Sequence, residues 1–123
     1  IRDRGGEGRW VLSCEHADRR SEWPVTVVLD DGAVAERVID RSFVDAQSGE
    51  RWIVDYKSSR PAEGESWSAF TARESEHYRE QLRGYRDALS HLGDAPIRCA
   101  LFFTSLGRLH EVNELDKPGE KHV

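Results

Sequence analysis

The sequence predicts a small α/β domain in which a central mixed β-sheet is flanked by helices. Residues 35–59 alternate between apolar and polar side chains on both sides of a polar turn, which is typical of two antiparallel strands. Residues 71–92 have the apolar periodicity of an amphipathic helix, and residues 97–103 form a nearly continuous apolar run that indicates a buried strand. Because the helix separates the second hairpin strand from this last strand, we expect those two strands to be parallel.

Length and composition agree with a single domain. The chain has 123 residues, of which 37% are hydrophobic and 33% charged, so we expect a thin core and an ionic surface. We place the domain at residues 9–115, with a linker or terminal boundary at 1–8 and a frayed tail at 116–123. No apolar run is long enough to span a bilayer and no signal peptide opens the sequence, which predicts a soluble cytoplasmic protein without a membrane partner.

The N-terminal part predicts two strands. The apolar run Arg9–Cys14 indicates the first, and the β-branched run Val25–Leu29, which follows Pro24, indicates the second. In the polar loop between them, His16 is interpreted as a solvated side chain rather than a metal ligand. An Asp-Asp-Gly turn at residues 30–32 then leads into the central hairpin.

The central hairpin carries two aspartates and a lysine. Strand alternation places Asp40 on the face opposite Ile39, Arg41 and Phe43. In the second strand, Asp55 and Lys57 share one face. Each of these residues alone could be a strand end or a partner in a surface ion pair, but together they place two carboxylates beside an ammonium group.

Two clustered carboxylates are costly to bury without compensation, and a divalent cation compensates them well. Mg²⁺ prefers oxygen ligands and usually keeps several waters beside one or two carboxylates and the phosphate oxygens of a substrate, and Mn²⁺ could substitute for it. A nearby lysine can orient a water molecule or offset negative charge on a phosphate. Asp40, Asp55 and Lys57 therefore indicate metal-dependent phosphoryl chemistry.

The segment after Lys57 predicts a mobile loop at residues 58–72 and then the helix. Thr71 and Glu74 resemble a capping box at the helix start, and Gly93 is a helix stop. An apolar stripe should pack the helix on the sheet; it consists of Tyr78, Leu82, Tyr85 and Leu89.

Two further features complete the chain. Gly84 lies within the helix and could permit a close approach to a strand. After the buried strand at 97–103, residues 109–112 are expected to extend the sheet.

The residues from Val38 to Ser59 resemble the core motif of the PD-(D/E)xK nuclease superfamily, and within it the RecB-like branch. That branch carries a hydrophobic-Ile-Asp-Arg strand, a turn, a hydrophobic-Asp-Tyr-Lys-Ser/Thr strand, and a Gln-x-x-x-Tyr on the following helix. The matching segments here are Val38–Arg41, Val54–Ser58 and Gln81–Tyr85. The resemblance covers residues 25–112 and implies a restriction-endonuclease-like core.

The resemblance implies a role for each matching residue. Asp40 and Asp55 would be metal ligands, Tyr56 would add its main-chain carbonyl oxygen, and Lys57 would be catalytic. The metal would be Mg²⁺, and Mn²⁺ could replace it.

The resemblance also assigns residues around this centre. By pattern alone, Gln81 is an exposed residue and Tyr85 a core residue, whereas the resemblance makes both of them flank the substrate. Glu22 matches a glutamate that often precedes the first core strand in the family, where it would support the site or order the loop.

The sequence departs from the RecB-like pattern before Val25. RecB-like nucleases usually have a helix there that carries an additional metal-ligating histidine, and no such helix is predicted here. Either the chain is a C-terminal fragment whose first helix lies upstream, or the site uses fewer protein ligands. We favour the fragment, because in AddA- and RecB-type helicase-nucleases this module follows a UvrD-like helicase.

Cysteine content excludes one cofactor of the family. Some relatives hold an iron-sulfur cluster with four cysteines, whereas this chain has two, Cys14 and Cys99. We therefore expect no iron-sulfur cluster. The two cysteines are interpreted as reduced, with a disulfide as the alternative.

The resulting hypothesis is a Mg²⁺-dependent DNA nuclease domain, expected to be an exonuclease, of a helicase-nuclease that processes double-strand breaks in recombinational repair. The net charge of −5 argues against a free-standing nucleic-acid binder. DNA, expected as single-stranded ends, would be delivered by a helicase domain, and a second helicase-nuclease subunit is a possible partner. The alternative is a nuclease-like module that holds DNA or contacts a subunit without cleavage. A type II restriction-like enzyme shares the fold, but the Gln-x-x-x-Tyr motif disfavours it.

Overall fold

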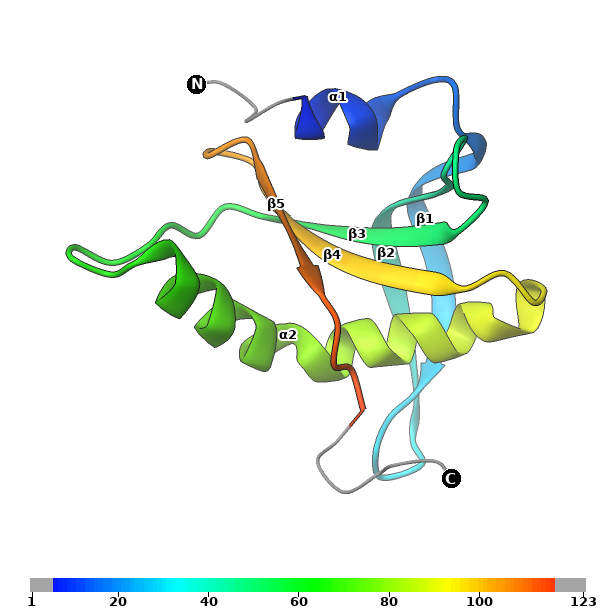
Figure 1. Cartoon of the computed structure of the whole chain (residues 1–123). Helices are drawn as coiled ribbons and strands as arrows, with labels where there is room; N and C mark the ends of the chain where they lie inside the picture. The colour runs from blue at the N-terminus through cyan, green and yellow to red at the C-terminus, as the bar shows by residue number, and fades with distance from the viewer. Residues whose placement is uncertain (1–5, 117–123) are drawn as a thin grey trace.

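The structure, a computed structural model, describes residues 6–116, and Figure 1 shows the arrangement of its helices and strands. In chain order the elements are α1 (Glu7–Leu12), β1 (Ala17–Val28), β2 (Val34–Val44), β3 (Arg51–Lys57), α2 (Trp67–Leu89), a 3₁₀ turn (Ser90–Leu92), β4 (Ile97–Phe103) and β5 (Arg108–Val112).

The strands form one five-stranded mixed sheet in the order β1-β2-β3-β4-β5. The pair β3–β4 is parallel, and the other neighbouring pairs are antiparallel. The parallel pair follows from the crossover through α2, as the sequence predicted. The predicted α/β class with a central mixed sheet is confirmed.

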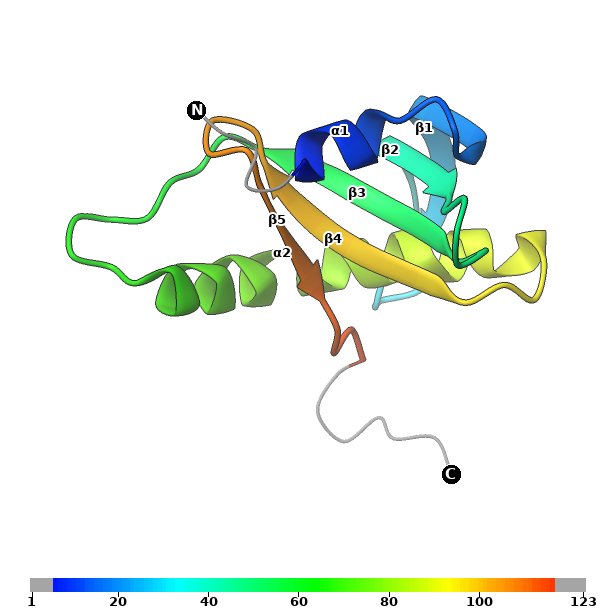
Figure 2. The same ribbon diagram turned by 45° about the horizontal axis from the view of Figure 1, so that its top comes forward.

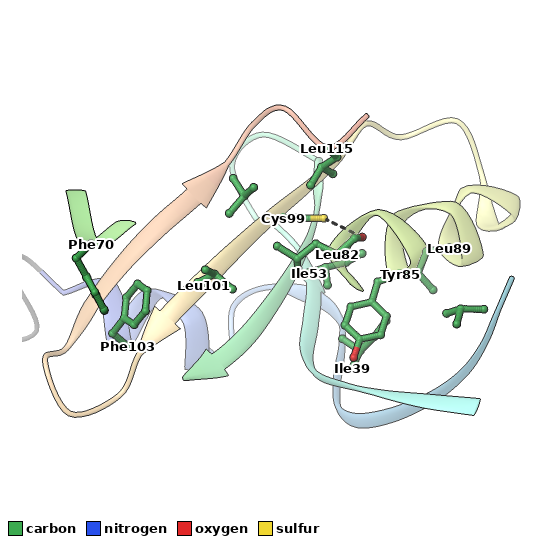
Figure 3. Packing of buried hydrophobic residues seen from close by; sticks show 12 residues of the cluster. Ile39, Ile53, Phe70, Leu82, Tyr85, Leu89, Cys99, Leu101, Phe103 and Leu115 are labelled. Atoms are coloured by element: carbon green, nitrogen blue, oxygen red, sulfur yellow. Dashed lines mark hydrogen bonds between the residues drawn. The ribbon is translucent and has the colours of Figure 1, made fainter. Parts of the chain in front are cut away.

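The two helices cover opposite faces of the sheet, as Figures 1 and 2 both show. The core beneath α2 is the larger one, and Figure 3 shows its packing around Tyr85, Leu82 and the middle strands. On the other face, Val11 of α1 packs against Phe43 and Val54 of the sheet. The α2 core positions the acidic part of β3, because Ile53, two residues before Asp55, is fully buried in it.

Helix α2 begins before the predicted start. Ser66 is its N-cap, and the Ser66 hydroxyl accepts a hydrogen bond from the Ala69 main-chain N–H at 3.0 Å. The capping box predicted at Thr71 and Glu74 is therefore wrong: both residues lie inside the helix and are buried. Residues 67–72, predicted as loop, are the first turns of α2. The predicted stop at Gly93 is confirmed, because the 3₁₀ turn after α2 ends there.

The N-terminal region differs from the prediction. Residues 9–12 belong to a short helix rather than a strand, since the aromatic ring of Trp10 packs edge-on against Phe43 and Trp52 at centroid distances of 5.1 and 5.0 Å. This helix lies before the first core strand, where none was predicted, although none of its residues is a histidine. It begins at Glu7, within the segment 1–8 that was predicted as a linker.

Strand β1 is longer than the predicted run from Val25. It begins at Ala17, because its polar first half also pairs with β2. The whole ladder runs from Ala17 opposite Val44 to Val28 opposite Val34. Most of the side chains in that half are exposed, so the apolar signal of a strand is missing there.

Both strands of the β1–β2 ribbon bend where Glu22 lies opposite Asp40. Glu22 has a φ of +49°, which side chains other than glycine rarely adopt, and no ladder pair joins it to Asp40. Ile39 packs in the α2 core, whereas Arg41 donates a hydrogen bond to the Val11 carbonyl on the α1 side. The predicted strict alternation of Ile39, Arg41 and Phe43 on one face is therefore wrong.

Three other expectations concern the chain as a whole. Cys14 is exposed and Cys99 is buried, and both are free thiols, so the alternative of a disulfide is wrong. Within residues 6–116, no helix is both long and apolar enough to cross a membrane. Residues 117–123 of the tail predicted at 116–123, and residues 1–5 of the linker predicted at 1–8, lie outside the described part of the chain. Asp116, the first residue of that tail, forms an ion pair with Arg86 at 2.9 Å.

Candidate active site

The candidate site forms where β2 leaves β3. The ladder between these strands ends at the pair Arg41 and Val54, so the next opposed positions are Asp40 and Asp55. The Asp40 carboxylate accepts a hydrogen bond from the Tyr56 main-chain N–H at 2.7 Å. This hydrogen bond satisfies a main-chain N–H of β3 beyond the end of the ladder and fixes Asp40 beside β3.

Asp55 and Lys57 point toward α2, as the alternation of β3 predicted. The Asp55 side chain is almost fully buried, and the Lys57 side chain is 18% exposed. The Lys57 ammonium nitrogen lies 2.7 Å from Asp55 Oδ2 and forms an ion pair with it. The structure thus brings Asp40, Asp55 and Lys57 together at one end of β3.

The electrostatics of the cluster reflect burial and like charge. Burial raises the pKa of Asp55 from 3.8 to about 6, and the neighbouring Asp40 adds to this, whereas Lys57 opposes it. Burial alone would lower the pKa of Lys57, but the bond to Asp55 and the charges around it outweigh burial, so its pKa lies above the ordinary value. The cluster therefore holds one carboxyl group whose ionised form is disfavoured and one ammonium group whose charged form is favoured.

The residues fit a divalent cation. Asp55 Oδ2 is fully buried and, although Lys57 lies close to it, no aligned hydrogen-bond donor within residues 6–116 satisfies it. An additional positive charge would compensate this oxygen. No group of three or more His, Cys, Asp or Glu side chains in the described residues could hold a metal. The protein ligands present are therefore two carboxylates and nearby main-chain oxygens, a set that suits Mg²⁺ with its remaining positions taken by water or substrate.

Gln81 and Tyr85 link α2 to the strand that carries Asp40. Gln81 Nε2 donates a hydrogen bond to the Tyr85 hydroxyl at 2.8 Å, and that hydroxyl donates to the Val38 carbonyl at 3.1 Å. Figure 3 shows Tyr85 packed next to Ile39, the residue before Asp40. Burial raises the pKa of Tyr85; the hydrogen bond from Gln81 opposes this shift, and the charges of Asp55 and Asp40 add to it. Tyr85 is buried, as the apolar stripe predicted, and Gln81 is partly exposed.

Tyr78 was predicted only as part of the apolar stripe, and sequence reasoning missed its second contact. The Lys57 ammonium nitrogen lies 3.6 Å from the centroid of the Tyr78 ring. The spacing contained a signal, because Tyr78 lies one helical turn before Gln81 and two turns before Tyr85 and so shares their face.

Glu74 is a second residue whose contact the sequence did not reveal. Its buried carboxylate accepts a hydrogen bond from the Ser59 hydroxyl at 2.6 Å and pairs with Arg73 at 3.0 Å. Since Ser59 lies two residues after Lys57, this contact ties the end of β3 to α2.

Two residues considered from the sequence do not join the cluster. His16 is buried, not solvated, and its ring stacks on the Phe43 ring at a centroid distance of 4.2 Å. Its Nε2 forms a hydrogen bond with the Trp10 carbonyl, and its Nδ1 accepts one from the Ala46 N–H. Glu22 is exposed at the bend opposite Asp40.

A cavity of about 650 Å³ lies between α2 and the tip of the β1–β2 ribbon rather than over the acidic pair. Gln81 is the residue that belongs both to this cavity and to the surroundings of the site.

A comparison with known protein families matches residues 15–121 to the PD-(D/E)XK nuclease superfamily. The chain therefore belongs to this superfamily, and its mixed sheet with flanking helices is consistent with a restriction-endonuclease-like fold. Members of the superfamily are generally hydrolytic nucleases that act on DNA and typically use divalent metal ions. No curated protein matches the chain.

Proposed function

We propose that this chain is a Mg²⁺-dependent deoxyribonuclease domain that hydrolyses phosphodiester bonds at the end of β3. The observation that carries the proposal is the convergence of Asp40, Asp55 and Lys57 where β2 leaves β3. The family match supports the reaction class, and the burial of Asp55 beside Asp40, with one oxygen that accepts no aligned hydrogen bond among residues 6–116, supports a cation next to it.

Each residue then has a defined task. Asp40 and Asp55 would hold the cation through their carboxylates, with the main-chain carbonyl of Tyr56 as a neutral ligand. When bound, the cation polarises the scissile phosphate and favours ionisation of the attacking water. Lys57 orients that water and offsets the negative charge that develops on the phosphate. Gln81 and Tyr85 flank the substrate. Gln81 donates a hydrogen bond to the Tyr85 hydroxyl, and that hydroxyl donates to the Val38 carbonyl, which holds α2 against β2.

We further propose that the domain is RecB-like and works as an exonuclease on single-stranded ends. The Gln81-x-x-x-Tyr85 motif beside the acidic pair supports this assignment. The net charge of −5 supports a helicase domain, or a second helicase-nuclease subunit, that delivers the DNA. In that setting the domain acts in end processing at double-strand breaks and in recombinational repair.

One observation favours a second candidate, a nuclease-like module that holds DNA or contacts a subunit without cleavage. The described residues contain no third acidic or histidine side chain at the acidic pair, and the Lys57 ammonium group already forms an ion pair with the Asp55 carboxylate. A module of this kind would bind no cation at Asp55.

Cleavage of single-stranded DNA in the presence of Mg²⁺ or Mn²⁺ tests the proposal, with wild type compared to Lys57→Ala. We expect Lys57→Ala to lose activity by about 100-fold or more, because removal of a charge-stabilising group costs catalysis on that order. Arg60→Ala is the matched control, since Arg60 is an exposed positive residue three positions later in the adjoining loop. Its rate should stay within about twofold of wild type if loss of charge alone has little effect. Equal rates for wild type and Lys57→Ala would remove the assignment.

A further inference from the structure

The contact between Lys57 and Tyr78 has no role in the function proposed so far. The Lys57 ammonium nitrogen lies 2.7 Å from Asp55 Oδ2 and 3.6 Å from the centroid of the Tyr78 ring, so it is held between a carboxylate and an aromatic face. A cation over a tyrosine ring within about 6 Å is attracted by the ring quadrupole, and the attraction grows when the cation is shielded from water. With 18% of its side chain exposed, Lys57 is largely shielded.

The two contacts respond differently to a divalent cation. Asp55 Oδ2 is the oxygen that Lys57 contacts, and it belongs to the carboxylate assigned to the cation. A carboxylate that binds a cation attracts an ammonium group less strongly, so the ion pair weakens as the site becomes loaded. The ring of Tyr78 is no cation ligand in this site and keeps its attraction for the ammonium group.

The lysine needs such a second anchor. Its ammonium is a compact point charge on a flexible four-carbon stem, which samples many rotamers once a partner is lost. A reacting group that drifts by about 1 Å can lose about 100-fold in rate.

We infer that Tyr78 is a positioning residue for Lys57, and that its ring face holds the ammonium group at the reacting phosphate while Asp55 serves the cation. This inference rests on the proposed function, because it assigns Lys57 a part in cleavage. Tyr78 acts through Lys57 and not on the substrate, so the aromatic ring is required and the hydroxyl is not.

The arrangement also distinguishes Tyr78 from an ordinary core residue. Leu82 and Tyr85 of the same stripe are buried, with 0% and 2% exposure, whereas Tyr78 is only partly buried. A partly exposed ring adds less to the core than its buried neighbours, yet it is the ring that faces the lysine of the site.

Two substitutions separate ring from hydroxyl. Tyr78→Phe keeps the aromatic face, and Tyr78→Leu removes it while leaving an apolar side chain on α2. We expect kcat for single-stranded DNA cleavage to fall about fivefold in Tyr78→Leu, with KM unchanged, and to stay at the wild-type value in Tyr78→Phe. Trp67→Leu is the matched control, because Trp67 also lies on α2 and its ring covers a different cation, the Arg108 guanidinium of β5, at 3.7 Å. It should lower the melting temperature and leave kcat unchanged.

A second readout needs neither metal nor activity. The ring current of Tyr78 should shift the Lys57 Hε proton resonances upfield in the NMR spectrum of the metal-free protein. The shift should persist in Tyr78→Phe and vanish in Tyr78→Leu, and the signal is assigned by its loss in Lys57→Ala.

The outcomes separate this inference from the proposed function. Wild-type activity with an equal kcat in Tyr78→Leu overturns the inference and leaves the nuclease assignment intact. A kcat loss in Tyr78→Leu that Trp67→Leu reproduces also overturns it, because the loss then follows stability. An inactive wild-type chain overturns the proposed function and the positioning role with it, and the NMR shift then reports whether the contact exists as packing alone.

Discussion

Asp55 is the residue on which the proposed chemistry of the site depends. It is 4% exposed, lies beside Asp40, and has an oxygen with no aligned hydrogen-bond donor among the described residues. Such a group is expensive to keep ionised in a folded protein. Such a group either lowers the stability of the folded protein or is compensated by a bound cation. Losses of stability of this kind are common at functional sites.

The shifted pKa of Asp55 predicts a dependence of stability on pH. Because burial and Asp40 raise this pKa from 3.8 to about 6, the folded protein binds more protons than the unfolded chain between about pH 4 and pH 6. The Asp55 contribution to the free energy of unfolding therefore falls as the pH rises through this window and is constant above it. Asp55→Asn abolishes this linkage. Relative to wild type, we expect Asp55→Asn to gain up to about 3 kcal/mol between pH 4 and pH 7 without metal.

Urea unfolding of both proteins in the presence of a chelator measures this difference. The carboxyls whose pKa values are lowered by partners, among them Asp18 and Asp45, act in the opposite direction but are common to both proteins and cancel. A stability difference that stays constant from pH 4 to pH 7 would contradict the environment described for Asp55.

At the scale of the elements, prediction from the sequence succeeded where side-chain patterns were strong. The apolar run at residues 97–103 correctly predicted β4, and residues 109–112 extend the sheet in β5 as expected. The alternation of β3 correctly placed Asp55 and Lys57 on one face. The start of α2 was misplaced, because Thr71 and Glu74 imitate a capping box while Ser66 is the actual cap.

Other elements were missed because their stability comes from distant contacts. The first half of β1 is polar and is held by its ladder with β2, and α1 is too short to show a helical period. The bend at Glu22 and Asp40 could not be predicted from the sequence. Glutamate rarely adopts a positive φ, and the surrounding sheet imposes it here. The meeting of Asp40 with Tyr56 N–H could therefore not be derived from alternation.

Gly84 provides a prediction at this scale. The sequence suggested that this glycine permits a close approach of α2 to a strand. A Cβ added at Gly84 would lie 3.6 Å from the Val27 Cβ, which is an ordinary van der Waals contact. We therefore expect Gly84→Ala to stabilise the protein by roughly 0.5–1 kcal/mol through helix propensity, measured by urea unfolding.

The reciprocal change provides the control for Gly84→Ala. Ala72→Gly introduces a glycine at an exposed position of α2 and should destabilise by a similar amount. Destabilisation by Gly84→Ala would mean that α2 and β1 approach each other more closely than described here.

At the scale of the whole molecule, the sheet supports the candidate site at one end of β3. Helix α2 covers one face and supplies Tyr78, Gln81 and Tyr85, while α1 covers the other face. The divergence of the β1–β2 ribbon from β3 opens the position at which the acidic pair meets. The sequence predicted the residues of this pair through the family motif, and the fold explains why they meet at this point of the sheet.

The central claim is that Asp40 and Asp55 share a divalent cation, and a metal titration followed by thermal melting tests it most directly. A ligand that binds only the folded state raises the melting temperature with its concentration. We predict such a rise with Mn²⁺ or Mg²⁺ for wild type and for the control Asp31→Asn, whose carboxylate lies in the exposed turn after β1 and accepts the Ala33 N–H. Asp55→Asn should show no rise. A wild-type melting temperature that does not change with the metal concentration, or a rise in melting temperature of equal size in Asp55→Asn, would contradict the account.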